Sequence, residues 1–123
     1  MSFDWSDFLT LADALATTDW DGNREASLRT AISRAYYAAF GEARLRLRSV
    51  LLATRRSAAE HGDIATFYAT RYGEQGAEVA AVLGRLRNRR NAADYDDDLA
   101  EVEALCNLSI EDAHNLLTPL ATF

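Results

Sequence analysis

Residues 85–95 carry the side chains best suited to chemistry, in the order Arg-Leu-Arg-Asn-Arg-Arg-Asn-Ala-Ala-Asp-Tyr. Arg87, Arg90 and Asp94 are spaced so that a helix would present two guanidinium groups and a carboxylate on one face. Arginine binds phosphate or carboxylate through two parallel hydrogen bonds, and a neighbouring carboxylate holds its planar group in position. The spacing therefore indicates an anion-binding site. Two more residues of the segment could add polar groups beside it, Asn91 and Tyr95.

Composition alone favours a plainer interpretation, a surface helix in which Arg90 pairs with Asp94 and the other arginines are solvated. Apolar residues precede the segment at helical spacing, at Val79, Leu83 and Leu86. The next positions on that inward stripe are Arg90 and then Ala93 or Asp94. An arginine without partners is costly in apolar surroundings. The helix is therefore expected to end in an ion-pair network, a subunit interface or an anion site.

A second polar face is expected within residues 33–40, which read Ser-Arg-Ala-Tyr-Tyr-Ala-Ala-Phe. Tyr36 and Phe40 fall on the core stripe of the helix predicted there. Arg34 and Tyr37 fall on an adjacent face, where Tyr37 could line a groove or a dimer seam. Arg34 and Tyr37 are therefore candidates for nucleic-acid binding, together with Arg87 and Arg90.

Charge is distributed unevenly along the 123-residue chain, whose formal net charge is −6. Residues 24–90 hold all thirteen basic residues, every one an arginine, against six acids, which gives that segment a net charge of +7. The flanking residues 1–23 and 91–123 hold the other thirteen acids and no bases. The total charge disfavours non-specific DNA binding, whereas the segregation permits a local positive face.

These residues must be positioned by helices, because the chain has one proline, long alanine-rich stretches and no strand-like alternation. A single domain over residues 1–123 is expected, an all-α antiparallel up-and-down bundle of four to five helices. The third helix is short and bracketed by Gly62 and by Gly73 with Gly76. The helices are expected at about 2–16, 24–53, around 64–68, 77–93 and 98–118, with turns at 17–23 and 94–98.

Composition also bounds the location of the protein. No apolar run approaches the roughly 18 residues of a membrane span, and the acidic N-terminus does not resemble a signal peptide. The single cysteine, Cys106, has no internal disulfide partner, which agrees with a reducing compartment. We therefore expect a cytoplasmic protein.

Other candidate sites are weaker. The acidic turn at 94–98 lacks the glycine and distal glutamate of a calcium-binding EF-hand loop, and suits the start of a helix better. His61 and His114 have no partner at zinc-ligand spacing, and His61 is expected at the surface just before the third helix. Cys106 is expected to be a buried, inert thiol. The sequence predicts no metal and no cofactor.

Three motifs together resemble the HEPN superfamily, and most closely its small, stand-alone prokaryotic members with an Ala-Asp-Tyr signature. They are Ala31-Ile-Ser-Arg-Ala-Tyr-Tyr-Ala-Ala-Phe40, then His61-Gly-Asp-Ile, then Arg90-Asn-Ala-Ala-Asp-Tyr-Asp96. The similarity spans nearly the whole chain. It implies a four- to five-helix bundle that pairs as a homodimer.

Active HEPN members are metal-independent ribonucleases, and many are toxins of toxin–antitoxin modules, often beside a nucleotidyltransferase antitoxin. Others are catalytically silent scaffolds. Their catalytic signature is an arginine, a polar residue and a histidine about five positions after the arginine. The resemblance assigns the first two roles to Arg90 and Asn91. The histidine is absent, because Tyr95 stands five residues on and Asp94 precedes it.

Two hypotheses follow. In the first, the protein belongs to a toxin–antitoxin or defence-type module and binds RNA, and could cleave it, at a dimer cleft. Arg87 and Arg90 would bind phosphate, and Asn91 would orient it. Asp94 and Tyr95 would position the site or supply residual acid–base chemistry. In the second, the motif is an ion-pair network in a silent module that binds a partner protein such as a nucleotidyltransferase. The missing histidine favours the second hypothesis for chemistry, since tyrosine is a poor general base at neutral pH. The segregation of the arginines favours the first hypothesis for the type of ligand.

Overall fold

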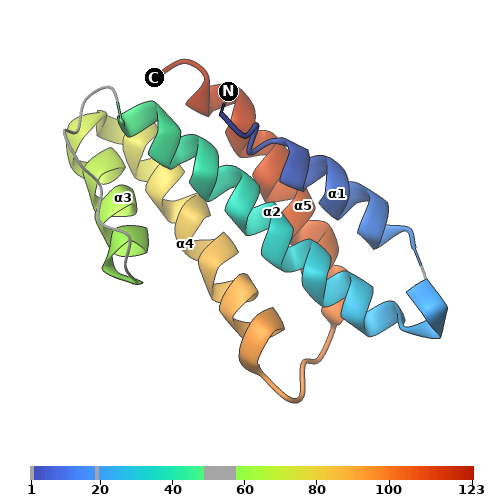
Figure 1. Cartoon of the computed structure of the whole chain (residues 1–123). Coiled ribbons are helices and arrows are strands. Elements are labelled where there is room, and N and C mark those ends of the chain that lie inside the picture. Colours follow the sequence, from blue (N-terminus) through green and yellow to red (C-terminus); the bar gives the residue numbers. More distant parts are fainter. Residues whose placement is uncertain (1, 19, 49–57) are drawn as a thin grey trace.

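The structure, a computed structural model, describes residues 2–18, 20–48 and 58–123, and this part of the chain is all-helical with no strand. Helices α1, α2, α4 and α5, whose bounds follow, lie alongside one another, and those that succeed each other in this order run in opposite directions (Figure 1). The α-helices are α1 (Asp7–Ala16), α2 (Arg24–Leu47), α3 (Ala58–Arg71), α4 (Gly73–Tyr95) and α5 (Val102–Leu120), and a short 3-10 helix, η1, spans Trp20–Gly22. The predicted all-α bundle is thereby confirmed.

Helix α2 occupies the centre of the bundle, where it contacts every other α-helix. Its start is capped by Asn23, whose side chain accepts a hydrogen bond from the backbone N–H of Ala26 at 3.3 Å. Its buried residues are mainly small, which lets the neighbouring helices approach its backbone closely. Buried alanines of α2 are Ala31, Ala35, Ala38, Ala39 and Ala43.

The core has two parts that meet on α2. One part packs the C-terminal half of α2 against α3, the first half of α4 and the end of α5. The other packs the N-terminal half of α2 against α1 and the start of α5, and it includes Ala93 near the end of α4. Tyr36 is 1% exposed and Cys106 is fully buried, as the sequence predicted. Helix α4 therefore lies in one core for most of its length and reaches the other only near its end.

Two glycines allow close approaches between elements. A side chain at Gly41 of α2 would overlap the indole ring of Trp5, so this glycine lets the N-terminal residues lie against α2. A side chain at Gly76 of α4 would overlap the backbone carbonyl oxygen of Tyr68 in α3. These contacts fix the N-terminus and α3 on the faces of α2 and α4.

Several predicted helix bounds were wrong. The first helix begins at Asp7 instead of residue 2, and residues 49–53 of the predicted second helix lie outside the described residues. Gly62 lies inside α3, because the buried packing of Ile64 and Tyr68 outweighs the helical cost of one exposed glycine. Gly73 has a positive φ of 63°, which suits the sharp turn between α3 and α4, so α4 begins there instead of at residue 77.

Candidate nucleic-acid interface

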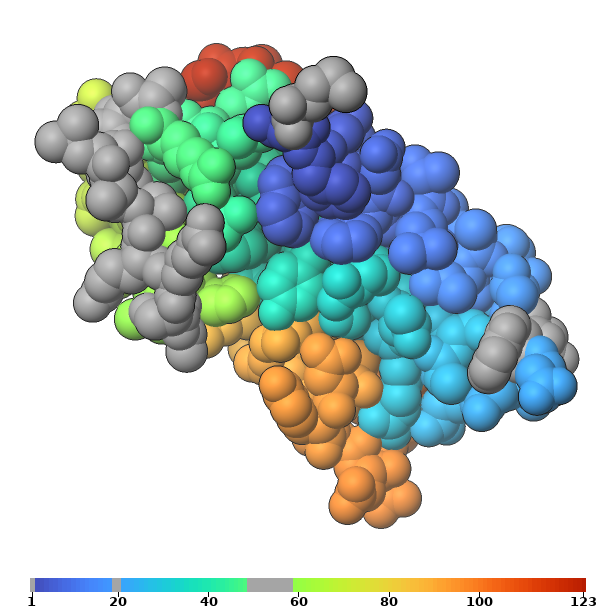
Figure 2. Space-filling view, viewed as in Figure 1, coloured from blue at the N-terminus to red at the C-terminus, as the bar shows by residue number. Residues whose placement is uncertain are grey.

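A face that alternates arginines with aromatic rings forms where α2, the first turn of α3 and the C-terminal half of α4 meet. We call it the guanidinium–aromatic face. Figure 2 shows the N-terminal residues (dark blue), α2 (cyan to green) and the end of α4 (orange) adjoining on one side of the molecule. Its arginines are Arg34, Arg44, Arg87 and Arg90, and its rings belong to Trp5, Phe8, Tyr37, Phe40, His61 and Tyr95.

Arg90 is held on this face by several partners. Its Nε lies 2.9 Å from Oδ2 of Asp94, an ion pair without hydrogen-bond geometry, and its NH1 donates to Oδ1 of Asn91 at 2.8 Å. Its guanidinium lies over the rings of Tyr37 and Tyr95, 5.1 and 5.7 Å from their centroids. The side chain is 16% exposed. Arg90 thus lies at the edge of the core, while Ala93 takes the buried position that follows on the stripe.

Arg34 extends the face toward α1. Its guanidinium lies 4.8 Å from the ring centroid of Phe8 and 5.0 Å from that of Tyr37, and it donates to the hydroxyl of Ser33 at 3.1 Å. Tyr37 therefore lies between Arg34 and Arg90 and joins the two predicted polar faces into one surface. The structure brings together Arg34, Tyr37 and Arg90.

Arg87 differs from its neighbours Arg85, Arg89 and Arg90 in forming no ion pair with any residue that the structure describes. Its Nε is buried and has no hydrogen-bond partner in the described part of the chain. Of the partly buried arginines in that part, only Arg34 and Arg87 form no ion pair. Two of the four arginines of the face are paired with carboxylates, Arg44 with Glu60 and Arg90 with Asp94, so two guanidinium charges, those of Arg34 and Arg87, stay unpaired among the described residues. Such a surface attracts anions.

The remaining candidate residues at the end of α4 differ in exposure. Asn91 is half-buried and accepts the hydrogen bond from Arg90, so its carbonyl group is already engaged. Besides its ion pair with Arg90, Asp94 accepts a hydrogen bond from the Ser33 hydroxyl at 3.4 Å, which joins α4 to α2. Tyr95 is 72% exposed and belongs to the last turn of α4. Of these three side chains, Tyr95 offers the most surface to a ligand.

His61 is a residue of this face that the sequence analysis missed. We expected a surface residue ahead of the third helix, which is wrong. It lies in the first turn of α3, half-buried, with its ring stacked on Phe40 at 4.5 Å between centroids and 17° between planes. Its Nδ1 is hydrogen-bonded to the hydroxyl of Tyr36. The signal in the sequence is helical spacing, since His61, Ile64 and Tyr68 share one face of α3.

Burial and charge both act on His61. Desolvation lowers the pKa of His61 below its ordinary value of 6.5, and the positive charges of Arg87 and Arg90 lower it further. Arg44 acts in the same direction, while Glu60 opposes it. The imidazole is therefore neutral at pH 7.

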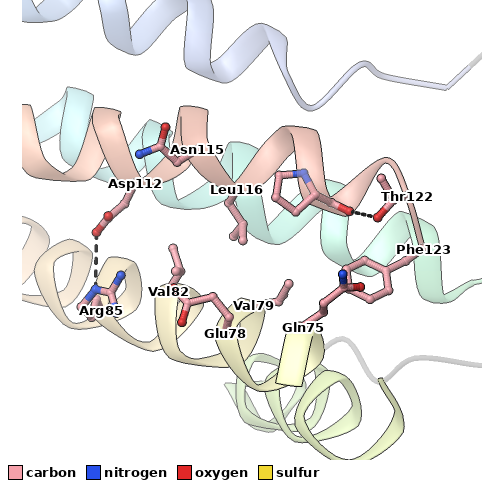
Figure 3. A pocket seen from close by; sticks show the side chains of 11 residues that line it. Gln75, Glu78, Val79, Val82, Arg85, Asp112, Asn115, Leu116, Thr122 and Phe123 are labelled. Atoms are coloured by element: carbon pink, nitrogen blue, oxygen red, sulfur yellow. Dashed lines mark hydrogen bonds and ion pairs between the residues drawn. The ribbon is translucent and has the colours of Figure 1, made fainter. Parts of the chain in front are cut away.

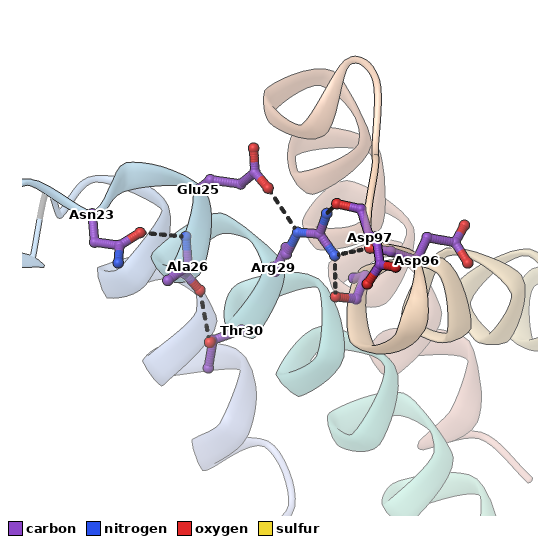
Figure 4. Close-up of polar contacts among 8 residues, drawn as sticks. Asn23, Glu25, Ala26, Arg29, Thr30, Asp96 and Asp97 are labelled. Atoms are coloured by element: carbon purple, nitrogen blue, oxygen red, sulfur yellow. Dashed lines mark hydrogen bonds and ion pairs between the residues drawn. The ribbon is translucent and has the colours of Figure 1, made fainter.

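The end of α4 is fixed by an arginine of α2 that the sequence analysis did not single out. Figure 4 shows Arg29 reaching from α2 to the loop that follows α4. Its guanidinium donates to the backbone carbonyls of Ala93, Asp96 and Asp97, at 3.1, 2.6 and 3.4 Å, and to Glu25 at 3.0 Å. These bonds satisfy carbonyl groups that a helix end leaves without partners.

The acidic residues that follow α4 form a loop and do not start a helix. The backbone of Asp96 is extended, and α5 begins at Val102, so the predicted helix start near Asp98 was wrong. Glu101, directly before Val102, has a positive φ of 58°, which lies outside right-handed helical geometry, so α5 starts only after it. The loop thereby positions Asp94 and Tyr95.

A groove of about 480 Å³ lies elsewhere, between α4 and α5 (Figure 3). Its floor is largely apolar, and its rim carries the ion pair of Arg85 with Asp112, at 3.6 Å. Arg85 and Arg87 point about 160° apart around α4, given 100° per residue. The groove therefore faces away from the guanidinium–aromatic face and contributes none of its side chains.

Cys106 and His114, the other candidate residues of the sequence, lie away from the guanidinium–aromatic face. Burial raises the pKa of the Cys106 thiol, which suits an inert core residue. His114 pairs with Asp13 at 3.0 Å on the exposed side of α1 and α5. Within the described residues, no helix combines the length and apolarity that crossing a membrane requires, and no cluster of three or more metal-ligating side chains occurs.

Comparisons with known proteins gave no match, whether with protein-family models, with curated proteins or with solved structures. The function must therefore be argued from the geometry of this face.

Proposed function

We propose that this chain is a HEPN-like protein of a toxin–antitoxin or defence-type module, which binds RNA on the guanidinium–aromatic face. The observation that carries the proposal is the state of Arg87 and Arg34. Both guanidinium groups are partly buried on one surface, and neither has a counter-ion in the described part of the chain. A phosphate group would supply the missing charge and the bidentate acceptor that arginine prefers.

The aromatic side chains favour single-stranded nucleic acid as the ligand. Successive bases stack on aromatic rings while cationic groups follow the backbone, and this combination recurs in single-strand binding. Tyr95 offers an exposed ring, and Tyr37 lies between Arg34 and Arg90. The homodimer and the cytoplasmic location expected from the sequence belong to the same proposal and stay predictions.

A specific observation favours a second candidate, a silent module whose face binds a partner protein such as a nucleotidyltransferase. Arg90, the arginine of the motif, is already bound to Asp94 and Asn91 and lies 16% exposed. An arginine that is satisfied within its own chain can serve to shape an interface. The two candidates differ in one measurable property, the affinity for RNA.

The test is fluorescence anisotropy with a random-sequence 30-nucleotide RNA pool, titrated with protein over a series of salt concentrations. Two phosphate contacts, at Arg34 and Arg87, would give a slope of log K against log salt of about −1.4 for a single strand. Arg87→Gln is expected to reduce the slope to about −0.7 and to weaken binding about fivefold at 0.1 M salt.

Arg85→Gln is the matched control, because it removes the same charge from the same helix on the side that faces the groove. It is expected to bind as wild type does. Absence of binding at low salt, or equal losses in both variants, would rule out RNA recognition by this face and leave the protein-binding module.

A further inference from the structure

The groove between α4 and α5 has an apolar floor and an arginine at one end. Figure 3 shows Val82 of α4 and Leu116 of α5 pointing into it, with Arg85 at one end and Phe123 at the other. Val82 and Leu116 are 7% and 3% exposed, so they form its floor. The volume of about 480 Å³ lies within the range of small-molecule sites in proteins, roughly 300–1,000 Å³, which combine apolar walls with a few polar groups. The groove is therefore large enough for a small ligand.

Arg85 has guanidinium donors that its own chain does not use. Its Nε lies 3.6 Å from Oδ2 of Asp112, beyond hydrogen-bond range, and Arg89 donates to the same oxygen at 2.8 Å. Arg85 forms no hydrogen bond with any residue that the structure describes, and its side chain is 48% exposed. Two guanidinium groups thus face one carboxylate, which leaves an excess of one positive charge at this end of the groove.

The acidic residue at the rim, Glu78, does not cancel this charge. It is exposed and precedes Arg85 by seven residues on α4, which places its backbone about 10 Å farther along the helix axis. That separation is about one Debye length at 0.1 M salt, so repulsion between Glu78 and an anion at Arg85 is largely screened. The end of the groove at Arg85 therefore favours an anionic group.

We propose that this groove binds a linear amphipathic carboxylate, a ligand with one terminal carboxylate and an apolar chain. The carboxylate accepts two parallel hydrogen bonds from the planar guanidinium of Arg85. The chain lies over Val82 and Leu116 and ends near Phe123. Arg85 and Gln75, which line opposite ends of the groove, are ten residues apart on α4, about 15 Å, so an alkyl chain of medium length fits. This site is independent of the proposed RNA binding, because the groove faces away from the guanidinium–aromatic face.

The experiment is isothermal titration calorimetry of the full chain with decanoate, kept below the concentration at which it forms micelles. Decanoate should bind with a negative change in heat capacity, because its chain leaves water for the floor of the groove. Decylamine carries a similar chain with a positive head group, and butanoate carries the same head group on a short chain. Both should bind about tenfold more weakly or worse, since each lacks one half of the recognition.

Variants test the two ends of the interaction separately. Arg85→Gln removes the guanidinium and should weaken decanoate binding about tenfold or more. Val82→Phe places a larger side chain in the groove and should abolish binding by filling it. Arg24→Gln is the matched control, because Arg24 is also a partly exposed arginine with one carboxylate partner, Glu103, and it does not line the groove. It should bind decanoate as wild type does.

The methyl resonances of the wild-type protein locate the ligand, so the test does not depend on the folding of any variant. Decanoate should shift the methyl resonances of Val79, Val82 and Leu116 and leave those of Leu28, which belongs to the other part of the core, in place. Shifts confined to another surface, or equal affinity for decylamine or butanoate, would overturn the proposal. An unchanged affinity in Arg85→Gln, or an equal loss in Arg24→Gln, would overturn it as well. Wild type that does not bind decanoate would also overturn it and would leave the RNA proposal untouched.

Discussion

Asp94→Asn tests whether the arginine of the motif is masked by its own chain. Arg90 lies 2.9 Å from the Asp94 carboxylate, and the two side chains are 16% and 29% exposed. The substitution keeps the shape of residue 94 but removes its charge, which releases Arg90 for a third phosphate contact. If RNA binds on this face, the variant should bind more tightly than wild type.

The expected size follows from the number of cations available. Wild type offers Arg34 and Arg87, which predicts a salt slope of about −1.4, and a third contact would change it to about −2.1. The added contact would raise affinity about fivefold at 0.1 M salt. The loss of one partly exposed ion pair should cost only about 0.5 kcal/mol of folding free energy. Binding and stability are therefore expected to change in opposite directions.

The assay is the same anisotropy titration, with thermal unfolding as the check on stability. Glu103→Gln is the matched control, because it removes the same charge from an exposed pair with Arg24 at 3.2 Å, away from the face. It should leave affinity and slope unchanged. An unchanged or weaker affinity for Asp94→Asn would refute the reasoning, since it would show that Arg90 does not reach phosphate once its partner is gone.

Four further predictions concern the scaffold. Gly41→Ala should lower the free energy of unfolding by about 1–3 kcal/mol in urea titrations because its methyl group would overlap Trp5. Gly84→Ala, where a methyl group meets nothing within 4 Å, should raise it by up to about 1 kcal/mol. Arg29→Ala should cost about 1.5–3 kcal/mol and abolish hydrogen-exchange protection at the end of α4. The lowered pKa of His61 means that the unfolded chain binds more protons below pH 6.5. Stability should therefore be constant above pH 6.5 and fall below it in wild type, with a smaller fall in His61→Gln.

Much of the bundle could be predicted because local patterns determine it. Val79, Leu83 and Leu86 recur at helical spacing, and all three are buried in the structure. Tyr36 also lies in the core, as its place on the α2 stripe indicated. The helix bounds were less predictable. Glycine is a poor helix former, so Gly62 was expected to bound the third helix, but it lies within α3. The tertiary packing of Ile64 and Tyr68, which are buried in α3, keeps this segment helical.

The face itself could be predicted only in part. The spacing of Arg87, Arg90 and Asp94 indicated the ion pair and the shared surface, because these residues lie on one helix. The contributions of His61 and Arg29 depend on contacts between residues 21 or more positions apart. No local pattern encodes such contacts, although the position of His61 on the buried stripe of α3 was a usable signal.

The most direct test is a crystal structure of the protein with a short 2′-O-methyl RNA, which can bind but lacks the hydroxyl that cleavage needs. We expect one phosphate oxygen within about 3 Å of the Arg87 guanidinium and another at a similar distance from that of Arg34. RNA bound on another surface, or a second protein copy that covers Arg87 and excludes RNA, would contradict the account.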